Sequence, residues 1–183
     1  MFAKLFKSRS SPPAAYEVPA GTRVYAVGDI HGRVDLLQRI QEMIAADAEA
    51  AQGLRKVLVY LGDYVDRGDA SREVLDHLLD HPLPGFETVY LMGNHEDILL
   101  VFLDDPSVGP NWFMNGGDAT MYSYGVGHPK AAGMEDRFQK MREAFKEKLP
   151  ARHLDFLRSL KTYHTEGSYI FVHAGIRPRC GRS

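Results

Sequence analysis

The sequence predicts an α/β fold, because apolar runs of strand length alternate with stretches of helical periodicity. Four such runs are present, and each is followed directly by a small group of polar residues. In α/β folds, ligands bind beyond the carboxyl ends of strands, where loops bring side chains together. The alternation therefore predicts the fold class, and the recurring polar groups predict where a functional site would form.

The four predicted strands are short and apolar, as buried strands are. They cover residues 24–27, 56–61, 88–92 and 168–172. The polar groups that follow them are Gly28-Asp29-Ile30-His31, Gly62-Asp63, Gly93-Asn94-His95-Glu96 and His173-Ala174-Gly175. Glycine permits the tight turns and the close backbone approach that a metal or phosphate site needs.

The predicted helices fill the segments between these strands. After the first strand, apolar residues at three- and four-residue spacing share one helix face: Val34, Leu37, Ile40 and Ile44. We expect this helix to end at Gly53 and a second one to have Ser71 as its N-cap. Further helices are predicted over residues 98–103, 137–149 and 150–160. Residues 111–127, which contain a tryptophan and several glycines, are expected to form loops with a packed aromatic edge.

The length, charge and composition of the chain narrow the classes of protein to which it could belong. A chain of 183 residues is long enough to bury the core of one domain. Its formal net charge of -2 gives no general attraction to nucleic acid or to an anionic membrane, so we expect neither partner. No apolar run approaches the roughly 20 residues that span a bilayer. The single cysteine, Cys180, excludes an internal disulfide and fits a reducing compartment, so we expect a cytoplasmic protein.

Residues 1–20 are expected to form a flexible N-terminal tail, and residues 21–183 a single domain. The segment 8–15 is rich in serine, proline and alanine, and the pair Pro12-Pro13 cannot continue a helix. Regular apolar patterning begins only at Thr22.

The polar groups at the strand ends contain the ligands that divalent metal ions prefer. They offer carboxylate, amide oxygen and imidazole donors and no thiolate, which argues against a structural zinc cluster. Asp29 and His31 are two residues apart, so on an extended segment both side chains point to the same side and could bind one ion. A carboxylate could bridge to a second ion. Two metals about 3.5–4 Å apart can activate water and clamp a phosphoryl group.

Each group also has a structural explanation when it is taken alone. Asn94 could cap a helix. Asp66-Arg67 could be a surface ion pair, and His173 could be a satisfied core histidine. The joint recurrence at four strand ends favours a metal site instead. The remaining histidines follow no ligand spacing and are mostly expected at the surface or on helix faces: His77, His81, His128, His153 and His164.

Three motifs follow one another in a fixed order. They are Asp-x-His-Gly from Asp29, Gly-Asp-x-Val-Asp-Arg-Gly from Gly62, and Gly-Asn-His-Glu from Gly93. Together with His173-Ala174-Gly175, they resemble the phosphoprotein-phosphatase family of metallophosphoesterases, within the calcineurin-like superfamily. The resemblance covers residues 23–178. It implies a four-layer α-β-β-α sandwich with two mixed sheets, and a metal-dependent phosphomonoester hydrolase.

The resemblance implies a site for two divalent metal ions, which are manganese in most members and iron with zinc in some. Asp29 and His31 would hold the first ion. Asp63 would bridge both ions, and Asn94 and His173 would hold the second.

The resemblance also implies the catalytic residues. A water activated by the two metals would attack phosphorus directly, without a phosphoenzyme. His95 would protonate the leaving oxygen, and Asp66 would hydrogen-bond His95 and raise its basicity. Arg67 would bind phosphate oxygens through its forked guanidinium.

The chain differs from the family at its end. It stops ten residues after His173, whereas family members continue and supply a later Gly-His motif whose histidine binds the second metal. We therefore expect a chain that is truncated at its C-terminus, with weaker binding of the second metal and reduced turnover. His128, His164 or a neighbouring subunit could replace the absent ligand.

Three functions are compatible with these motifs. The segment Val65-Asp66-Arg67-Gly68 favours a serine/threonine protein phosphatase acting on a phosphorylated protein or a small phosphoester, and this is the leading prediction. A symmetric diadenosine tetraphosphate hydrolase has the same metal chemistry, but the residues that match His31 and Asp66 often differ there. A chain without the later histidine could instead bind metal or phosphate without hydrolysis.

Overall fold

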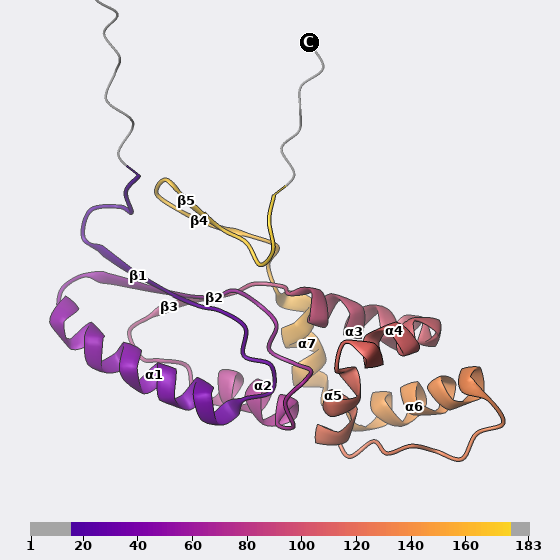
Figure 1. Cartoon of the computed structure of the whole chain (residues 1–183). Coiled ribbons are helices and arrows are strands. Elements are labelled where there is room, and N and C mark those ends of the chain that lie inside the picture. The colour runs from indigo at the N-terminus through magenta and orange to yellow at the C-terminus, as the bar shows by residue number, and fades with distance from the viewer. Residues whose placement is uncertain (1–15, 177–183) are drawn as a thin grey trace, which may run out of the picture.

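A three-stranded parallel sheet forms the centre of the fold (Figure 1). The computed structural model describes residues 16–176. The strands are β1 (Thr22–Val27), β2 (Arg55–Tyr60) and β3 (Glu87–Tyr90), in the order β1-β2-β3. The first three predicted strands are therefore confirmed, with ends that differ by one or two residues.

The fourth predicted strand forms, but it does not join the parallel sheet. β5 (Tyr169–Phe171) pairs antiparallel with β4 (His164–Glu166) in a separate hairpin. Gly167 has φ +59° in the turn, a conformation that glycine adopts without strain. A three-residue strand such as β4 is too short to give a periodic signal, so the sequence pattern did not reveal it.

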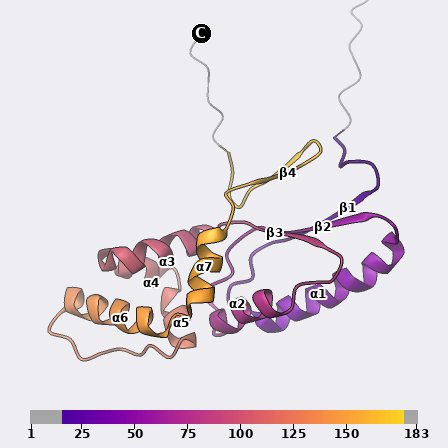
Figure 2. The same ribbon diagram turned by 180° about the vertical axis from the view of Figure 1, so that it is seen from behind.

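Helices and the hairpin lie on opposite faces of the parallel sheet (Figures 1 and 2). α1 (Val34–Ala48) and α2 (Ser71–Asp80) cover one face, where Leu58 and Tyr60 join the main core. Val57 and Val59 alternate with them and form a second cluster, against which Phe171 of the hairpin packs. This alternation of buried side chains explains why β2 reads as a continuous apolar run.

The remaining helices gather beyond one end of the sheet (Figure 1). They are α3 (Asn94–Asp104), α4 (Gly109–Met114), α5 (Gly117–Ser123), α6 (Met134–Lys148) and α7 (Ala151–Ser159), with the short 3-10 turn η2 (Pro106–Val108) before α4. Another 3-10 turn, η1 (Glu49–Ala51), directly follows α1. The expectation of loops over residues 111–127 is wrong in large part, because this segment contains most of α4 and all of α5. Helices of six and seven residues are too short to show a period, and Gly116, at φ +96°, supplies the turn between them.

Two smaller predictions also need correction. The first helix ends at Ala48 and passes into a 3-10 turn before Gly53. Ser71 begins α2 but caps nothing there, since its hydroxyl accepts the backbone N–H of Asp66 instead. Among the histidines expected mostly at the surface or on helix faces, His153 lies on α7 and is completely buried, between Tyr124 and Asp76.

The register of the sheet brings the predicted site residues to one edge. Val27, Tyr60 and Tyr90 lie in one row across the three strands. Because the strands are parallel and end level, the polar segments that follow them emerge side by side.

No helix in residues 16–176 is long and apolar enough to cross a membrane. Residues 1–15 of the expected tail lie outside the described residues. Residues 177–183, which include Cys180, lie outside them as well.

Candidate metal centre and active site

The loops that follow β1 and β2 are joined by backbone hydrogen bonds. The N–H groups of Ile30 and His31 both lie 2.9 Å from the Asp63 carbonyl, and Gly32 N lies 2.9 Å from the Tyr64 carbonyl. Four non-glycine residues of these loops have positive φ: His31, Asp63, Asp66 and Arg67. Such backbone strain is stored preferentially at functional sites, and all four are residues that the sequence proposed for the site.

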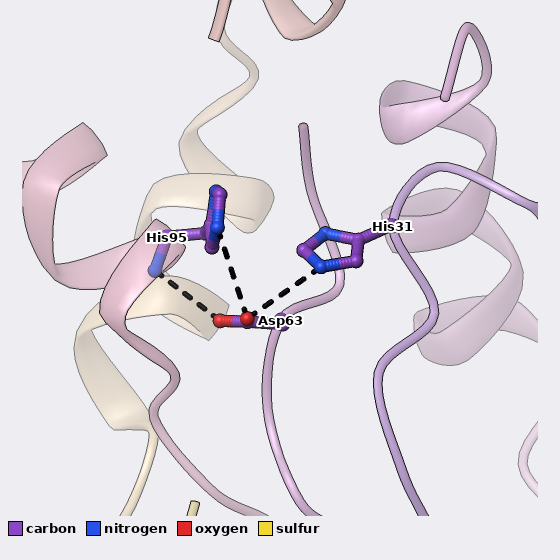
Figure 3. Close-up of side chains that lie close together, drawn as sticks. All are labelled: His31, Asp63 and His95. Atoms are coloured by element: carbon purple, nitrogen blue, oxygen red, sulfur yellow. Dashed lines mark hydrogen bonds and ion pairs between the residues drawn. The ribbon is translucent and has the colours of Figure 1, made fainter. Parts of the chain in front are cut away.

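The Asp63 carboxylate lies at the middle of the site. Its Oδ2 is 3.6 Å from His31 Nε2 and 3.3 Å from His173 Nε2. Figure 3 shows the rings of His31 and His95 on either side of this carboxylate. Asp63 is buried, and the N–H of His95 donates a hydrogen bond to its Oδ1, so the carboxylate is held in one place.

His31 directs one ring nitrogen into the site. Its Nδ1 lies 2.9 Å from the Val65 carbonyl, so this nitrogen carries the hydrogen and Nε2 carries the lone pair. Nε2 lies 3.8 Å from Asp29 Oδ2 as well as near Asp63. The structure thus brings together the three residues expected at the first metal.

His173 is oriented in the same way. Its Nδ1 lies 2.9 Å from the Leu61 carbonyl, which leaves the Nε2 lone pair 3.0 Å from Asn94 Oδ1. With Asp63 Oδ2 at 3.3 Å, three hydrogen-bond acceptors converge without a donor among them. A divalent cation resolves this conflict. The oxygen and nitrogen donors of the expected ligand set therefore fit a metal at both positions.

The geometry adds one candidate ligand to the expected set. Two groups of side chains each place one ligand atom per residue within 4.8 Å: His31 with Asp63 and His95, and Asp29 with Asp63 and His173. His95 Nε2 lies 3.9 Å from Asp63 Oδ2. His95 is thus placed where it could bind a metal or donate a proton, and the ring nitrogen cannot do both at once.

His95 and Asp66 form a buried pair. His95 Nδ1 lies 2.7 Å from Asp66 Oδ2, and both side chains are excluded from solvent. The hydrogen bond to Asp66 raises the pKa of His95, against the opposing effect of burial. A carboxylate partner of this kind favours the protonated form of the ring, which is the form that a general acid uses.

The Arg67 guanidinium connects the two halves of the site. Its Nη1 lies 2.7 Å from His31 Nε2, and its Nη2 lies 3.1 Å from His95 Nε2. His31 Nε2 has a single lone pair, so it cannot accept this hydrogen bond and bind a metal at the same time. Arg67 is exposed and has a flexible stem, so its guanidinium could move away from His31 if a metal bound that nitrogen.

Glu96 is a site residue whose role the sequence did not reveal. This completely buried carboxylate accepts the backbone N–H groups of Asp63, Tyr64, Val65 and Gly93 at 2.7–3.2 Å. Burial raises the pKa of Glu96 to about 7, and the amide hydrogen bonds oppose this rise. Its position as the third residue of α3 was the available signal, since a glutamate there often caps a helix. Glu96 fixes the Asp63 loop to the start of α3.

The sequence matches the model of the calcineurin-like phosphoesterase family over residues 22–180. This chain belongs to that family. The match includes all the strand-end motifs, so the metallophosphoesterase fold expected from them is confirmed. Phosphoprotein phosphatases are more distant relatives.

Three proteins illustrate what the chain is similar to. The symmetrical bis(5'-nucleosyl)-tetraphosphatase of Dechloromonas aromatica (strain RCB) is 33% identical over 157 residues, which are 85% of this chain and 44% of that protein. The serine/threonine-protein phosphatase BSL2 of Arabidopsis thaliana is 32% identical over 88 residues, which are 48% of this chain and 8% of that protein. A crystal structure of a putative diadenosine tetraphosphatase has a TM-score of 0.52 at 22% identity, over 89% of this chain and 55% of that one. This chain thus spans less than half the length of the curated relatives that it matches.

Proposed function

We propose that this chain hydrolyses dinucleoside tetraphosphates symmetrically, and that it uses two divalent metal ions to do so. One observation carries the proposal: the 33% identity to a symmetrical bis(5'-nucleosyl)-tetraphosphatase extends over 85% of this chain. The similarity to a protein phosphatase extends over only 48% of it. The comparisons therefore favour the tetraphosphate hydrolase over the serine/threonine protein phosphatase, which was the leading prediction from the sequence.

Five side chains would hold the metals. We assign Asp29, His31 and Asp63 to the first ion, and Asp63, Asn94 and His173 to the second. Support comes from the converging acceptors around Asp63 Oδ2, at 3.3–3.6 Å from the two imidazoles. When bound, such ions activate water and neutralise phosphate charge. Manganese is the ion that we expect.

The protein groups around the metals would bind the substrate and supply a proton. Arg67 would pair with phosphate oxygens, because its guanidinium is exposed and lies beside His31 and His95. His95 would donate a proton to the leaving oxygen, with Asp66 holding its other ring nitrogen. A diphosphate leaving group is a weaker base than an alkoxide. It depends less on this proton than the serine oxygen of a phosphoprotein does.

A protein phosphatase remains the second candidate. The Gly-Asp-x-Val-Asp-Arg-Gly segment from Gly62 favours it, as does the similarity to the phosphatase BSL2. Both activities would use the same metal ligands and the same pair of His95 and Asp66, so only the substrate distinguishes them.

The test is a direct comparison of two substrates. The purified chain with manganese is given either bis(5'-adenosyl) tetraphosphate or a phosphoserine peptide at equal concentration. We expect the tetraphosphate to be cleaved at least about tenfold faster, with adenosine diphosphate as the only nucleotide product. Faster cleavage of the peptide would overturn the proposal, and so would formation of adenosine mono- and triphosphate. Asp63→Asn serves as the control and should abolish both reactions.

A further inference from the structure

We propose that Trp112 and Thr120 are positioning residues, which hold Asp66 so that His95 presents Nε2 to the leaving oxygen. The proposal deepens the proposed function, since it rests on His95 acting as the general acid. Trp112 lies on α4 and Thr120 on α5, and both side chains are completely buried. Each directs its polar group at the Asp66 carboxylate.

The Asp66 carboxylate receives side-chain hydrogen bonds on both oxygens. Oδ1 lies 2.6 Å from Thr120 Oγ1. Oδ2 lies 2.8 Å from Trp112 Nε1 and 2.7 Å from His95 Nδ1. Asp66 has no exposed surface, and a buried carboxylate is costly unless donors satisfy it. The three donors come from three helices, α3, α4 and α5, so the carboxylate is held from several sides.

The chemistry of these donors fixes the orientation of the His95 ring. An indole N–H can only donate, so Asp66 Oδ2 accepts from Trp112. Thr120 Oγ1 accepts the Asp66 backbone N–H at 2.9 Å, which leaves its hydroxyl hydrogen for Oδ1. Because both carboxylate oxygens act as acceptors, His95 Nδ1 carries a hydrogen toward Asp66, and Nε2 faces the site.

This orientation serves the proton transfer. As a hydroxide derived from water forms the new P–O bond, the old P–O bond breaks and its electron pair goes to the leaving oxygen. That oxygen takes the proton from His95 Nε2 and leaves a neutral imidazole. A carboxylate that can shift or rotate would hold the ring less firmly in the line of transfer. The rate would then fall most for leaving groups of high basicity, which depend most on the acid.

Trp112 is itself held by its surroundings. Its ring lies 4.9 Å from the ring of Phe102 and 6.2 Å from that of Phe145. Gly117 approaches so closely that a Cβ there would lie 2.4 Å from the indole. A phenylalanine at position 112 keeps an aromatic ring in this packed position and removes the indole N–H. Trp112→Phe therefore tests the hydrogen bond rather than the packing.

The experiment uses Trp112→Phe and Thr120→Val in the full chain with manganese. The substrates are phenyl phosphate, whose leaving group is basic, and 2,4-dinitrophenyl phosphate, whose leaving group is not. We expect kcat for phenyl phosphate to fall about tenfold in each variant, with KM and the dinitrophenyl rate nearly unchanged. Thr120→Ser, which keeps the hydroxyl, should restore the wild-type ratio. An equal fall for both substrates, or none, would overturn the proposal.

A second readout needs no turnover. The Nδ1 proton of His95, assigned by its loss in His95→Phe, should give a downfield, exchange-protected NMR signal that shifts in Trp112→Phe and Thr120→Val. An unchanged signal in both variants would contradict the proposal. Tyr124→Phe is the matched control, because it removes a different buried hydrogen bond, 2.7 Å from Tyr124 Oη to His153. If the aryl phosphates are cleaved and the dinucleoside tetraphosphate is not, the proposed function fails while the positioning role stands.

Discussion

The carboxylate of Glu96 lies 2.9 Å from the backbone nitrogen of Asp63, so a buried residue of α3 holds the loop that carries this proposed metal ligand. Glu96→Gln replaces one acceptor oxygen with a donor that faces backbone N–H groups. We expect manganese affinity to fall about tenfold and the melting temperature to drop. Equilibrium dialysis and circular dichroism measure the two effects. Unchanged manganese affinity would show that Glu96 has no role in placing Asp63.

Replacement of His95 separates its two possible roles. His95→Phe removes both ring nitrogens but keeps a planar ring in a buried position. If His95 is the general acid, bound manganese is unchanged, and kcat for phenyl phosphate falls by about 10²–10⁴-fold. Elemental analysis beside the kinetic assay measures both quantities. Loss of one metal per chain would instead identify His95 as a ligand, in line with its place beside His31 and Asp63.

Arg67 is expected to contribute to substrate binding and not to metal binding. Arg67→Met keeps a flexible stem and removes the guanidinium that lies 2.7 Å from His31 Nε2. KM should rise about tenfold through loss of a charged phosphate contact. Manganese affinity should stay the same or increase, since a competitor for the His31 lone pair is gone. Weaker manganese binding in this variant would contradict the assignment.

Acid should destabilise the protein through His153. Burial lowers the pKa of His153, although Asp76 opposes this shift. As the pH falls below about 6.5, the unfolded chain takes up this proton before the folded one does, so the free energy of unfolding decreases. His153→Gln removes this contribution. Its melting temperature should change less than that of wild type between about pH 7.5 and about pH 5.5. Equal changes in the two proteins would refute this explanation.

The sequence predicted which candidate site residues lie together better than it predicted the contacts that support them. The motif residues follow strands whose apolar runs are easy to recognise, and parallel strands bring their carboxyl ends to one edge. The supports of Asp66 come from helices that lie 46 and 54 residues further along the chain, at Trp112 and Thr120. Contacts at such separation depend on how α4 and α5 pack, and these helices are too short to be predicted from periodicity.

The sequence also did not predict which polar side chains are buried. The position of Glu96 near the start of α3 is a signal for a helix cap, but nothing in the local sequence of Glu96 or His153 shows that the side chain is buried. Only the tertiary structure provides the four amides around Glu96 and the Tyr124–Asp76 environment of His153.

A manganese titration of the wild-type chain and of Asp63→Asn tests the proposed metal centre most directly. Asp63 Oδ2 is the one carboxylate oxygen that lies within 3.6 Å of both His31 Nε2 and His173 Nε2 in the described part of the chain. We predict about two manganese ions per wild-type chain, and clearly weaker binding with one ion or none in Asp63→Asn. Hydrolysis of bis(5'-adenosyl) tetraphosphate should appear only as the metals bind. The same number of ions at the same affinity in Asp63→Asn would contradict the proposed centre.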